Sequence, residues 1–139
     1  MPALTRLSIS LEAPLAKRLD RLMKAAGATN RSEFIRDMIR GALVEDEWTE
    51  PEREVVGVIT LVYDHHARQL VERLMDLQHD HHDAILATTH VHVSHDRCAE
   101  MIMIRGQAGR VRALVDQMRQ QRGVLHCGLS LSSTGAALK

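Results

Sequence analysis

The sequence predicts an α+β protein in two parts: a small strand-helix-helix segment, followed by a larger domain of order βαββαβ. Two observations carry this prediction. The spacing of apolar residues alternates along the chain between the period of a strand and that of a helix. An acidic stretch, residues 45–54, interrupts that spacing, and a chain of 139 residues has room for a small module beside one compact domain.

The first segment begins with Arg6–Leu11, where polar and apolar residues alternate as in a strand with one buried face. Apolar residues at helical spacing follow Pro14, which a first helical turn tolerates, and Gly27 ends this helix. Asn30, with Glu33 three residues later, forms a capping pattern for a second helix that runs to about Val44.

So short a segment cannot bury its own apolar faces, and a twofold partner would solve this problem. Two copies can pair their strands into an antiparallel ribbon, with alternate residues buried: Leu7, Ile9 and Leu11. The outward side chains are then Arg6, Ser8 and Ser10. Because a two-stranded ribbon fits the DNA major groove, these three are the predicted base-reading residues of a ribbon-helix-helix domain.

Residues 46–54 are expected to form an exposed linker between a first domain, residues 1–45, and a second, residues 55–133. Four strands are predicted in the second domain, at Val55–Tyr63, Ala84–Val93, Ala99–Ile104 and Val124–Leu131. Two helices are predicted, one at about residues 65–78 and one that begins near Val111 and ends at Gly123. The order βαββαβ is the ferredoxin-like plan, an antiparallel sheet with two helices on one face.

Composition narrows the function classes. The sequence has no apolar run of about 18 residues and no export signal, so we expect an intracellular, cytoplasmic protein without a membrane partner. A net charge of zero argues against nucleic acid, yet residues 1–44 carry eight basic and four acidic residues, and residues 45–139 carry ten and fourteen. The two cysteines are expected to be thiols or ligands rather than a disulfide.

Six of the nine histidines lie between positions 79 and 95. His90 and His92 are two apart on a predicted strand and therefore share a face, and Cys98 begins the neighbouring strand. Imidazole and thiolate together suit zinc, copper or nickel. The alternative is that the histidines are surface decoration and that Cys98 is a small buried hydrophobe.

The remaining candidates are less specific. His79 could be a ligand or a solvated cation at a helix end. For its neighbours His81 and His82, no role in the metal site, or a role as weak secondary ligands, is favoured over a place among the main ligands. His126 and Cys127 lie on the last strand, where a packing or surface role is favoured.

Taken together, these motifs closely resemble the nickel-responsive transcriptional regulators of bacteria and archaea over nearly the whole chain. The resemblance rests on Arg6–Leu11, on Asn30–Asp37, on Gln78-His79, on His90-Val91-His92 and on His95-Asp96-Arg97-Cys98. It implies a homotetramer, a dimer of dimers, whose C-terminal domains form a core of the regulatory ACT type with ribbon-helix-helix dimers at its ends.

The resemblance also implies a ligand set and an effector. One Ni(II) per subunit would be bound by His90, His92 and Cys98, with His79 of a neighbouring subunit completing a square plane. Nickel binding would then favour one arrangement of the subunits on operator double-stranded DNA and repress nickel uptake genes. Glu33 and Asp37 match a family position where a secondary cation can bind.

One stretch departs from the family. Several members have consecutive basic residues early in the first core-domain helix that reach the DNA backbone, whereas this chain reads His65-His66-Ala67-Arg68. Arg68 alone is reliably basic there, so backbone contacts are expected to be fewer, or His65 and His66 contribute in a pH-sensitive way. Serine at positions 8 and 10, where other members often have threonine, would alter methyl contacts with bases.

Two other functions remain open at this stage. The chain could be a metal storage or delivery protein whose first segment only dimerises, or a repressor that answers to copper, cobalt or an amino acid. An enzyme is not expected, because the sequence shows no nucleophile, base and oxyanion arrangement and four protein ligands leave little room for substrate.

Overall fold

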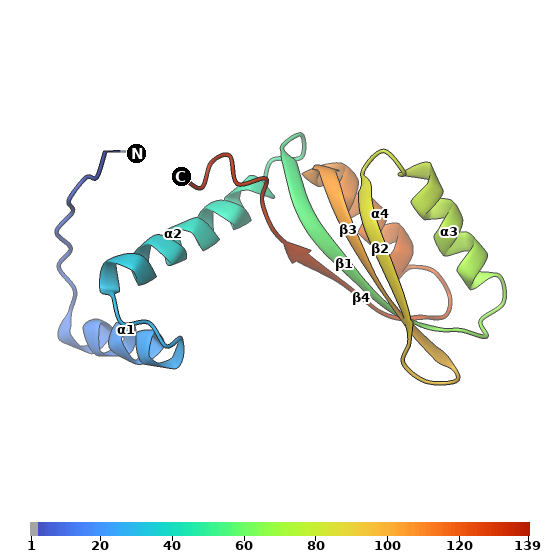
Figure 1. Cartoon of the computed structure of the whole chain (residues 1–139), viewed down its shortest axis with the longest axis horizontal. Helices are drawn as coiled ribbons and strands as arrows, with labels where there is room; N and C mark the ends of the chain where they lie inside the picture. Colours follow the sequence, from blue (N-terminus) through green and yellow to red (C-terminus); the bar gives the residue numbers. More distant parts are fainter. Residues whose placement is uncertain (1–2) are drawn as a thin grey trace. The chain divides into compact units, whose positions relative to one another are not determined.

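The computed structural model describes residues 3–139, which divide into two compact units. One unit holds the chain up to Leu43 together with Leu138–Lys139, and the other holds Val44–Ala137. The first contains α1 (Ala13–Ala25) and most of α2 (Arg31–Glu47), drawn in blue and cyan in Figure 1. No helix among the described residues is long and apolar enough to cross a membrane.

The two N-terminal helices form where the sequence predicts them. Pro14 lies in the first turn of α1, and Gly27, with a φ of 66°, follows its end in the left-handed conformation that glycine tolerates. The Asn30 side-chain oxygen accepts hydrogen bonds from the backbone N–H groups of Ser32 and Glu33, at 2.9 and 3.2 Å. Asn30 is therefore the N-cap of α2.

Residues 3–12 form neither helix nor strand within one chain. Strand pairing needs hydrogen bonds to a neighbouring strand, so the predicted ribbon at Arg6–Leu11 requires a second chain and stays a prediction. The apolar side chains of this unit face solvent: Leu7 is 79% exposed, Ile9 62% and Leu22 57%. They line a cleft of about 510 Å³ with Leu11, Leu15, Leu19, Ile35 and Met38.

The expectation of an exposed stretch after the second helix is wrong in part. Helix α2 continues to Glu47, three residues beyond the predicted end, and Glu47 and Trp48 are buried. The Trp48 indole N–H donates to the Ser132 carbonyl at 2.8 Å, and its ring lies against Gly57, where a Cβ would approach it to 3.0 Å. An aromatic side chain that fills a place left by glycine holds this stretch against the sheet.

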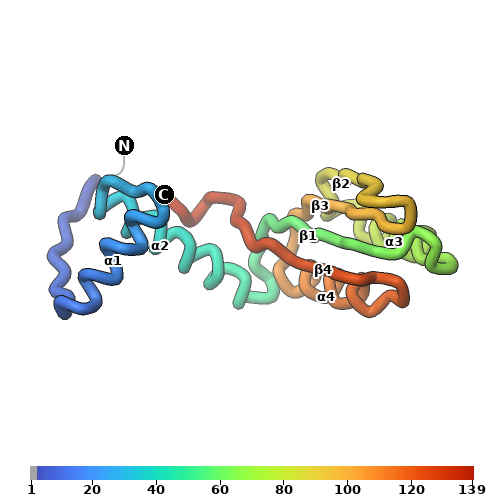
Figure 2. Tube along the Cα trace, turned by 90° about the horizontal axis from the view of Figure 1, so that it is seen from below, coloured from blue at the N-terminus to red at the C-terminus, as the bar shows by residue number. Residues whose placement is uncertain are grey.

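The second unit confirms the βαββαβ order. Its elements are β1 (Glu54–Asp64), α3 (Leu70–Asp80), β2 (Ile85–His92), β3 (Arg97–Gln107), α4 (Ala108–Arg119) and β4 (Val124–Leu131). The four strands form one antiparallel sheet of order β2-β3-β1-β4, and Figure 2 shows them following one another in that order. This is the ferredoxin-like plan.

Side chains alternate across the sheet, as the period of a strand requires. One face of β1 is buried and includes Val55, Ile59, Leu61 and Tyr63, while the residues between them are half-buried. The buried face packs with α3 and α4 in one core that contains Leu70, Leu74, Val111, Leu114 and Met118. Both helices therefore cover the same face.

Helix α3 begins five residues later than predicted. The chain after β1 makes turns through residues 65–69, and Gln69 has a φ of 59° immediately before the helix. This loop packs on the turn before β4, because a Cβ on Gly123 would lie 2.5 Å from the Ala67 Cβ and 2.9 Å from a Leu70 methyl.

Gly123→Ala should destabilise the fold through two effects. The φ of 100° at Gly123 is strained for any residue with a Cβ, and the added methyl would overlap Ala67 and Leu70. Together these should lower the free energy of unfolding by about 2 kcal/mol or more in denaturant titrations at fixed protein concentration. Gly135→Ala is the control, because its φ of 83° is similar but nothing lies within 4 Å. Equal losses in the two variants would contradict the packing argument.

Candidate metal centre

The pairing of β2 with β3 places two of the predicted ligands directly opposite each other. His92 pairs with Cys98 and His90 pairs with Glu100, so the register that the sequence left open is settled within the chain. Residues directly opposite in an antiparallel pair share a face, and Cys98 lies on the buried face of β3. Both histidines therefore point to the side of the sheet that carries the helices.

A third side chain, His65, completes a group of three potential ligands. The Cys98 Sγ lies 3.4 Å from the His92 Nδ1 and 3.4 Å from the His65 Nδ1. One ligand atom from each residue lies within 4.8 Å of the others. Two imidazole nitrogens beside one sulfur fit a borderline divalent ion, as nickel and zinc do.

Sequence reasoning noted His65 for DNA contacts and not as a neighbour of the thiol. The backbone explains its position: Tyr63 pairs with Cys98 at the end of β1, and the His65 N–H donates to the Asp96 carbonyl at 2.8 Å. The sequence signal that could have identified His65 is its position just after the central strand. Residues at that end of the strand must lie beside the β2–β3 turn.

His90 lies beside the three-residue group rather than in it. Its ring centroid is 5.1 Å from that of His92, and its ring stacks on Tyr63 at 6.3 Å with an interplanar angle of 13°. Within one chain, the described residues therefore bring His92 and Cys98 into ligand range of each other, with His90 adjacent.

A partly buried hydrogen-bond network connects the strands beside His90 to helix α3. Glu100 is only 8% exposed, and its carboxylate accepts a hydrogen bond from the Gln78 side-chain amide at 2.9 Å. The Thr88 hydroxyl donates to the Gln78 amide oxygen at 3.3 Å. Burial, with the charge of Glu100, raises the pKa of Tyr63 to about 12. Gln78 immediately precedes His79, so the network reaches the end of α3 that carries this predicted ligand.

His79 lies in the last turn of α3, exposed and apart from the Cys98 group. Its ring is 5.9 Å from that of His82. The Nδ1 atoms of His81 and His82 contact the carbonyls of Leu77 and His79 at 2.9 and 3.0 Å. These two side chains thus interact with the carbonyls that every helix end leaves without helical partners.

The surroundings of the Cys98 side chain favour its neutral thiol form over the thiolate. It is fully buried, and burial, with a smaller effect of Glu100, raises the pKa of Cys98 above its usual value. A thiolate in this place therefore needs a positive charge beside it, which a divalent ion would supply. Cys127 is also a free thiol, and burial raises its pKa as well. Its Sγ lies 3.7 Å from the Val115 carbonyl, in the core.

In the N-terminal unit, the predicted base readers Arg6, Ser8 and Ser10 are all exposed. Glu33 and Asp37 face arginines: Glu33 pairs with Arg36, and Arg40 lies 3.4 Å from Glu33 and 2.8 Å from Asp37. The hydrogen bond from Arg36 lowers the pKa of Glu33. Within the chain these two carboxylates are thus paired with arginines, and the secondary cation site stays a prediction.

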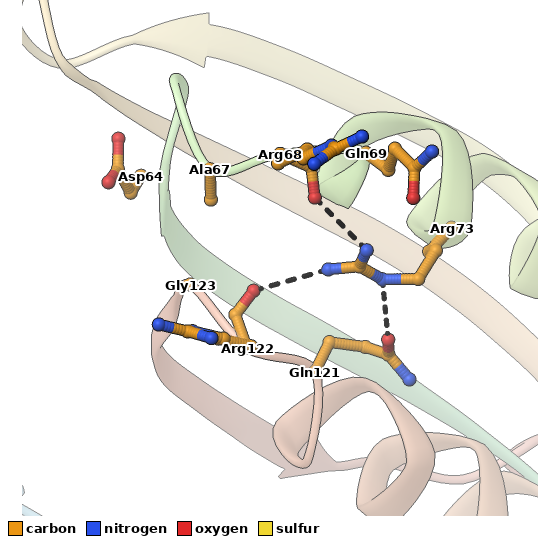
Figure 3. A pocket seen from close by; sticks show the side chains of 8 residues that line it. All are labelled: Asp64, Ala67, Arg68, Gln69, Arg73, Gln121, Arg122 and Gly123. Atoms are coloured by element: carbon orange, nitrogen blue, oxygen red, sulfur yellow. Dashed lines mark hydrogen bonds between the residues drawn. The ribbon is translucent and has the colours of Figure 1, made fainter.

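A basic cleft of about 820 Å³ opens between the start of α3 and the turn before β4 (Figure 3). Arg73 is held there by hydrogen bonds to the Gln121 side chain and to the carbonyls of Arg68 and Arg122, at 3.0, 3.0 and 3.4 Å. Arg68 and Arg122 are exposed at its rim. Sequence reasoning identified Arg68 but missed Arg122, which only the fold brings near it.

Two family models match the chain. Residues 56–132 match the model described as the NikR C terminal nickel binding domain, and residues 5–46 match that of the ribbon-helix-helix protein, copG family. A solved structure of an uncharacterized protein from Thermotoga maritima shares the fold of part of the chain, with a TM-score of 0.52 and 15% identity. It covers 56% of this chain and 96% of its own.

Relatives match over almost the full length. A protein of Solibacter usitatus is 45% identical over all of both chains, and one of Desulfotalea psychrophila is 47% identical over 97% of this chain and 98% of its own. One of Thermococcus onnurineus is 38% identical over 97% and 98%. All three carry the name "Putative nickel-responsive regulator". With a ribbon-helix-helix region followed by a nickel-binding domain, this chain belongs to the nickel-responsive regulator family, a family of regulators and not of enzymes.

Proposed function

We propose that this protein is a nickel-dependent repressor that binds operator DNA when Ni(II) occupies the site built around Cys98. The observation that carries the proposal is the buried thiol paired directly across the sheet with His92. Nickel uptake genes are the proposed targets, since a repressor that binds DNA only with nickel would stop nickel uptake when the metal is sufficient.

The proposed ligands are His90, His92 and Cys98 of one subunit and the partner subunit's His79, with one ion per subunit. His90 and His92 share a face of β2, while His79 lies exposed on α3 and apart from them in its own chain. A ligand from a second chain would complete the four. The family resemblance supports assigning this ligand to the partner subunit's His79, and the exposure of His79 in its own chain leaves it accessible to another subunit.

Two exposed apolar surfaces support assembly into a homotetramer with an ACT-type core. The open face of the sheet carries Met101 and Met103, 46% and 44% exposed, beside half-buried Val58 and Val62. The N-terminal cleft lined by Leu7, Ile9 and Leu11 is the other. Apolar surface of this kind is typical of subunit contacts. A dimer of dimers would use the first surface for the core and the second for the ribbons.

DNA contact is assigned to two groups of side chains. Arg6, Ser8 and Ser10 would read base edges from the paired ribbon, as arginine and serine commonly do in the major groove. Arg68 and Arg122, at the rim of the basic cleft, would contact phosphates. Nickel would favour the subunit arrangement in which both groups reach one operator.

Nickel titration of the apo-protein tests the ligand set. A thiolate-to-nickel charge-transfer band should grow to one ion per subunit at the strong site, and operator affinity should rise with it. Cys98→Ala should abolish the band and the gain in affinity. Cys127→Ala, which removes a second free and largely buried thiol, should leave both unchanged. A band without any change in DNA binding would favour storage or delivery, and no band would reject nickel at Cys98.

Nickel affinity should depend on pH through the Cys98 thiol. Because the pKa of Cys98 is raised, the apo-protein holds the thiol protonated at neutral pH, and metal binding must release that proton. Affinity measured by chelator competition should therefore rise about tenfold per unit between pH 7 and 8.5. Cys98→Ala should lose this dependence. A flat profile for the native protein would mean that the thiol is not a ligand.

Arg6→Ala tests the DNA-reading role. Loss of one bidentate base contact should weaken operator binding by about 1–3 kcal/mol while nickel binding stays intact. Arg122→Ala should instead weaken binding to all sequences and reduce its salt dependence. Electrophoretic mobility or fluorescence anisotropy at several salt concentrations separates the two effects. Unchanged operator affinity in Arg6→Ala would show that the ribbon only dimerises.

A further inference from the structure

A second group of potential metal ligands lies beside the first. One ligand atom each from His66, His95 and Asp96 lies within 4.8 Å of the others, and all three residues are exposed. The His66 Nε2 is 3.2 Å from an Asp96 carboxylate oxygen, and the His66 and His95 ring centroids are 5.6 Å apart. None of the three belongs to the ligand set proposed around Cys98.

The backbone holds this group together. His66 follows β1, and its N–H donates to the Asp64 carboxylate at 2.9 Å. His95 and Asp96 lie in the β2–β3 turn, which is closed by N–H donation from Val93 and Ser94 to the Arg97 carbonyl at 2.9 and 3.2 Å. The bond from the His65 N–H to the Asp96 carbonyl, described above, joins the two loops. The three side chains are thus brought together by main-chain hydrogen bonds and not by a chance meeting of long side chains.

The chemistry of this group differs from that of the Cys98 group. Two imidazoles and one carboxylate suit borderline divalent ions such as nickel, cobalt and zinc. Side chains that are 56% and 66% exposed, for His66 and Asp96, leave the remaining coordination positions to water. An ion there would bind more weakly than at a site that contains a thiolate, and would exchange readily.

The two groups are connected through adjacent histidines. The ring of His65, a member of the Cys98 group, lies 5.3 Å from that of His66 and 5.4 Å from that of His92. An open cavity of about 420 Å³ is lined by His65, His66, His92, Ser94 and His95, so two histidines of each group face the same space. The His65 imidazole thus lies next to His66 on one side and has its Nδ1 3.4 Å from the Cys98 Sγ on the other.

We propose that His66, His95 and Asp96 form an accessory capture site for a divalent transition-metal ion, which is passed through His65 to the Cys98 site. The capture part stands on its own geometry, while the transfer part rests on the proposed function. With nickel as the probe, the native protein should bind a second, weaker ion per chain that contributes no thiolate charge-transfer band.

The test uses His66→Ala/His95→Ala in the full chain, with His126→Ala as the control, because His126 is exposed on β4 and lies outside both groups. Equilibrium dialysis against nickel should show loss of the weak ion in the double variant alone. Stopped-flow growth of the charge-transfer band at limiting nickel should be several-fold slower in that variant, with the same final amplitude. Circular dichroism verifies the fold.

Each outcome decides one part of the proposal. A weak ion that persists in the double variant would overturn the capture site. Loss of the ion with an unchanged loading rate would overturn the transfer. In Cys98→Ala, which lacks the thiolate, the weak ion should remain. If the native protein showed no charge-transfer band but kept a weak ion that the double variant lacks, the Cys98 proposal would fail and the capture site would stand.

Discussion

The chemistry of this protein depends on the antiparallel pairing of β3 with its two neighbours. Pairing with β2 places His92 opposite Cys98, and pairing with β1 places Tyr63 opposite the same cysteine. Because side chains alternate across a strand, a slip of one residue would move Cys98 to the other face, away from the core and from both histidines. The proposed metal centre is therefore as well specified as the core, since the same register buries Ile102 and Ile104.

Burial of the thiol links stability to metal selectivity. A buried Cys98 is stable in the core as a neutral thiol, and its raised pKa keeps it so without an ion. At the proposed site, a divalent ion would reverse this preference, because it would stabilise the thiolate and coordinate the neighbouring imidazoles. The core is thus compatible with a neutral thiol when no metal is bound, and the proposed site would favour ions with high affinity for sulfur and nitrogen, which can displace the thiol proton.

The sequence was most informative where pattern is local. The strand and helix order, the Asn30 cap and the end of α1 just before Gly27 follow from residues within a few positions of each other. Three features were not predicted from the sequence, because each depends on residues that are distant along the chain. Trp48 is buried through contacts with Gly57 and Ser132, His65 approaches Cys98 through the sheet, and Arg122 lines a cleft with Arg68. The predicted Arg6–Leu11 ribbon would need a second chain to form.

Why a regulator would place a ligand on a second subunit follows from linkage. A site complete within one chain binds its ion equally well in every arrangement of subunits and so cannot favour any of them. A site that needs the partner's His79 binds tightly only in arrangements that bring α3 of one chain to β2 of another. The difference in nickel affinity between arrangements is then the free energy available to organise the DNA-binding ribbons, typically about 1–3 kcal/mol per coupled pair of sites. In this protein the Gln78–Glu100 hydrogen bond ties the residue before His79 to the strand opposite His90. In the proposed assembly, metal bound at one end of that link would therefore restrain the helix that carries His79, the ligand proposed for the partner subunit's site.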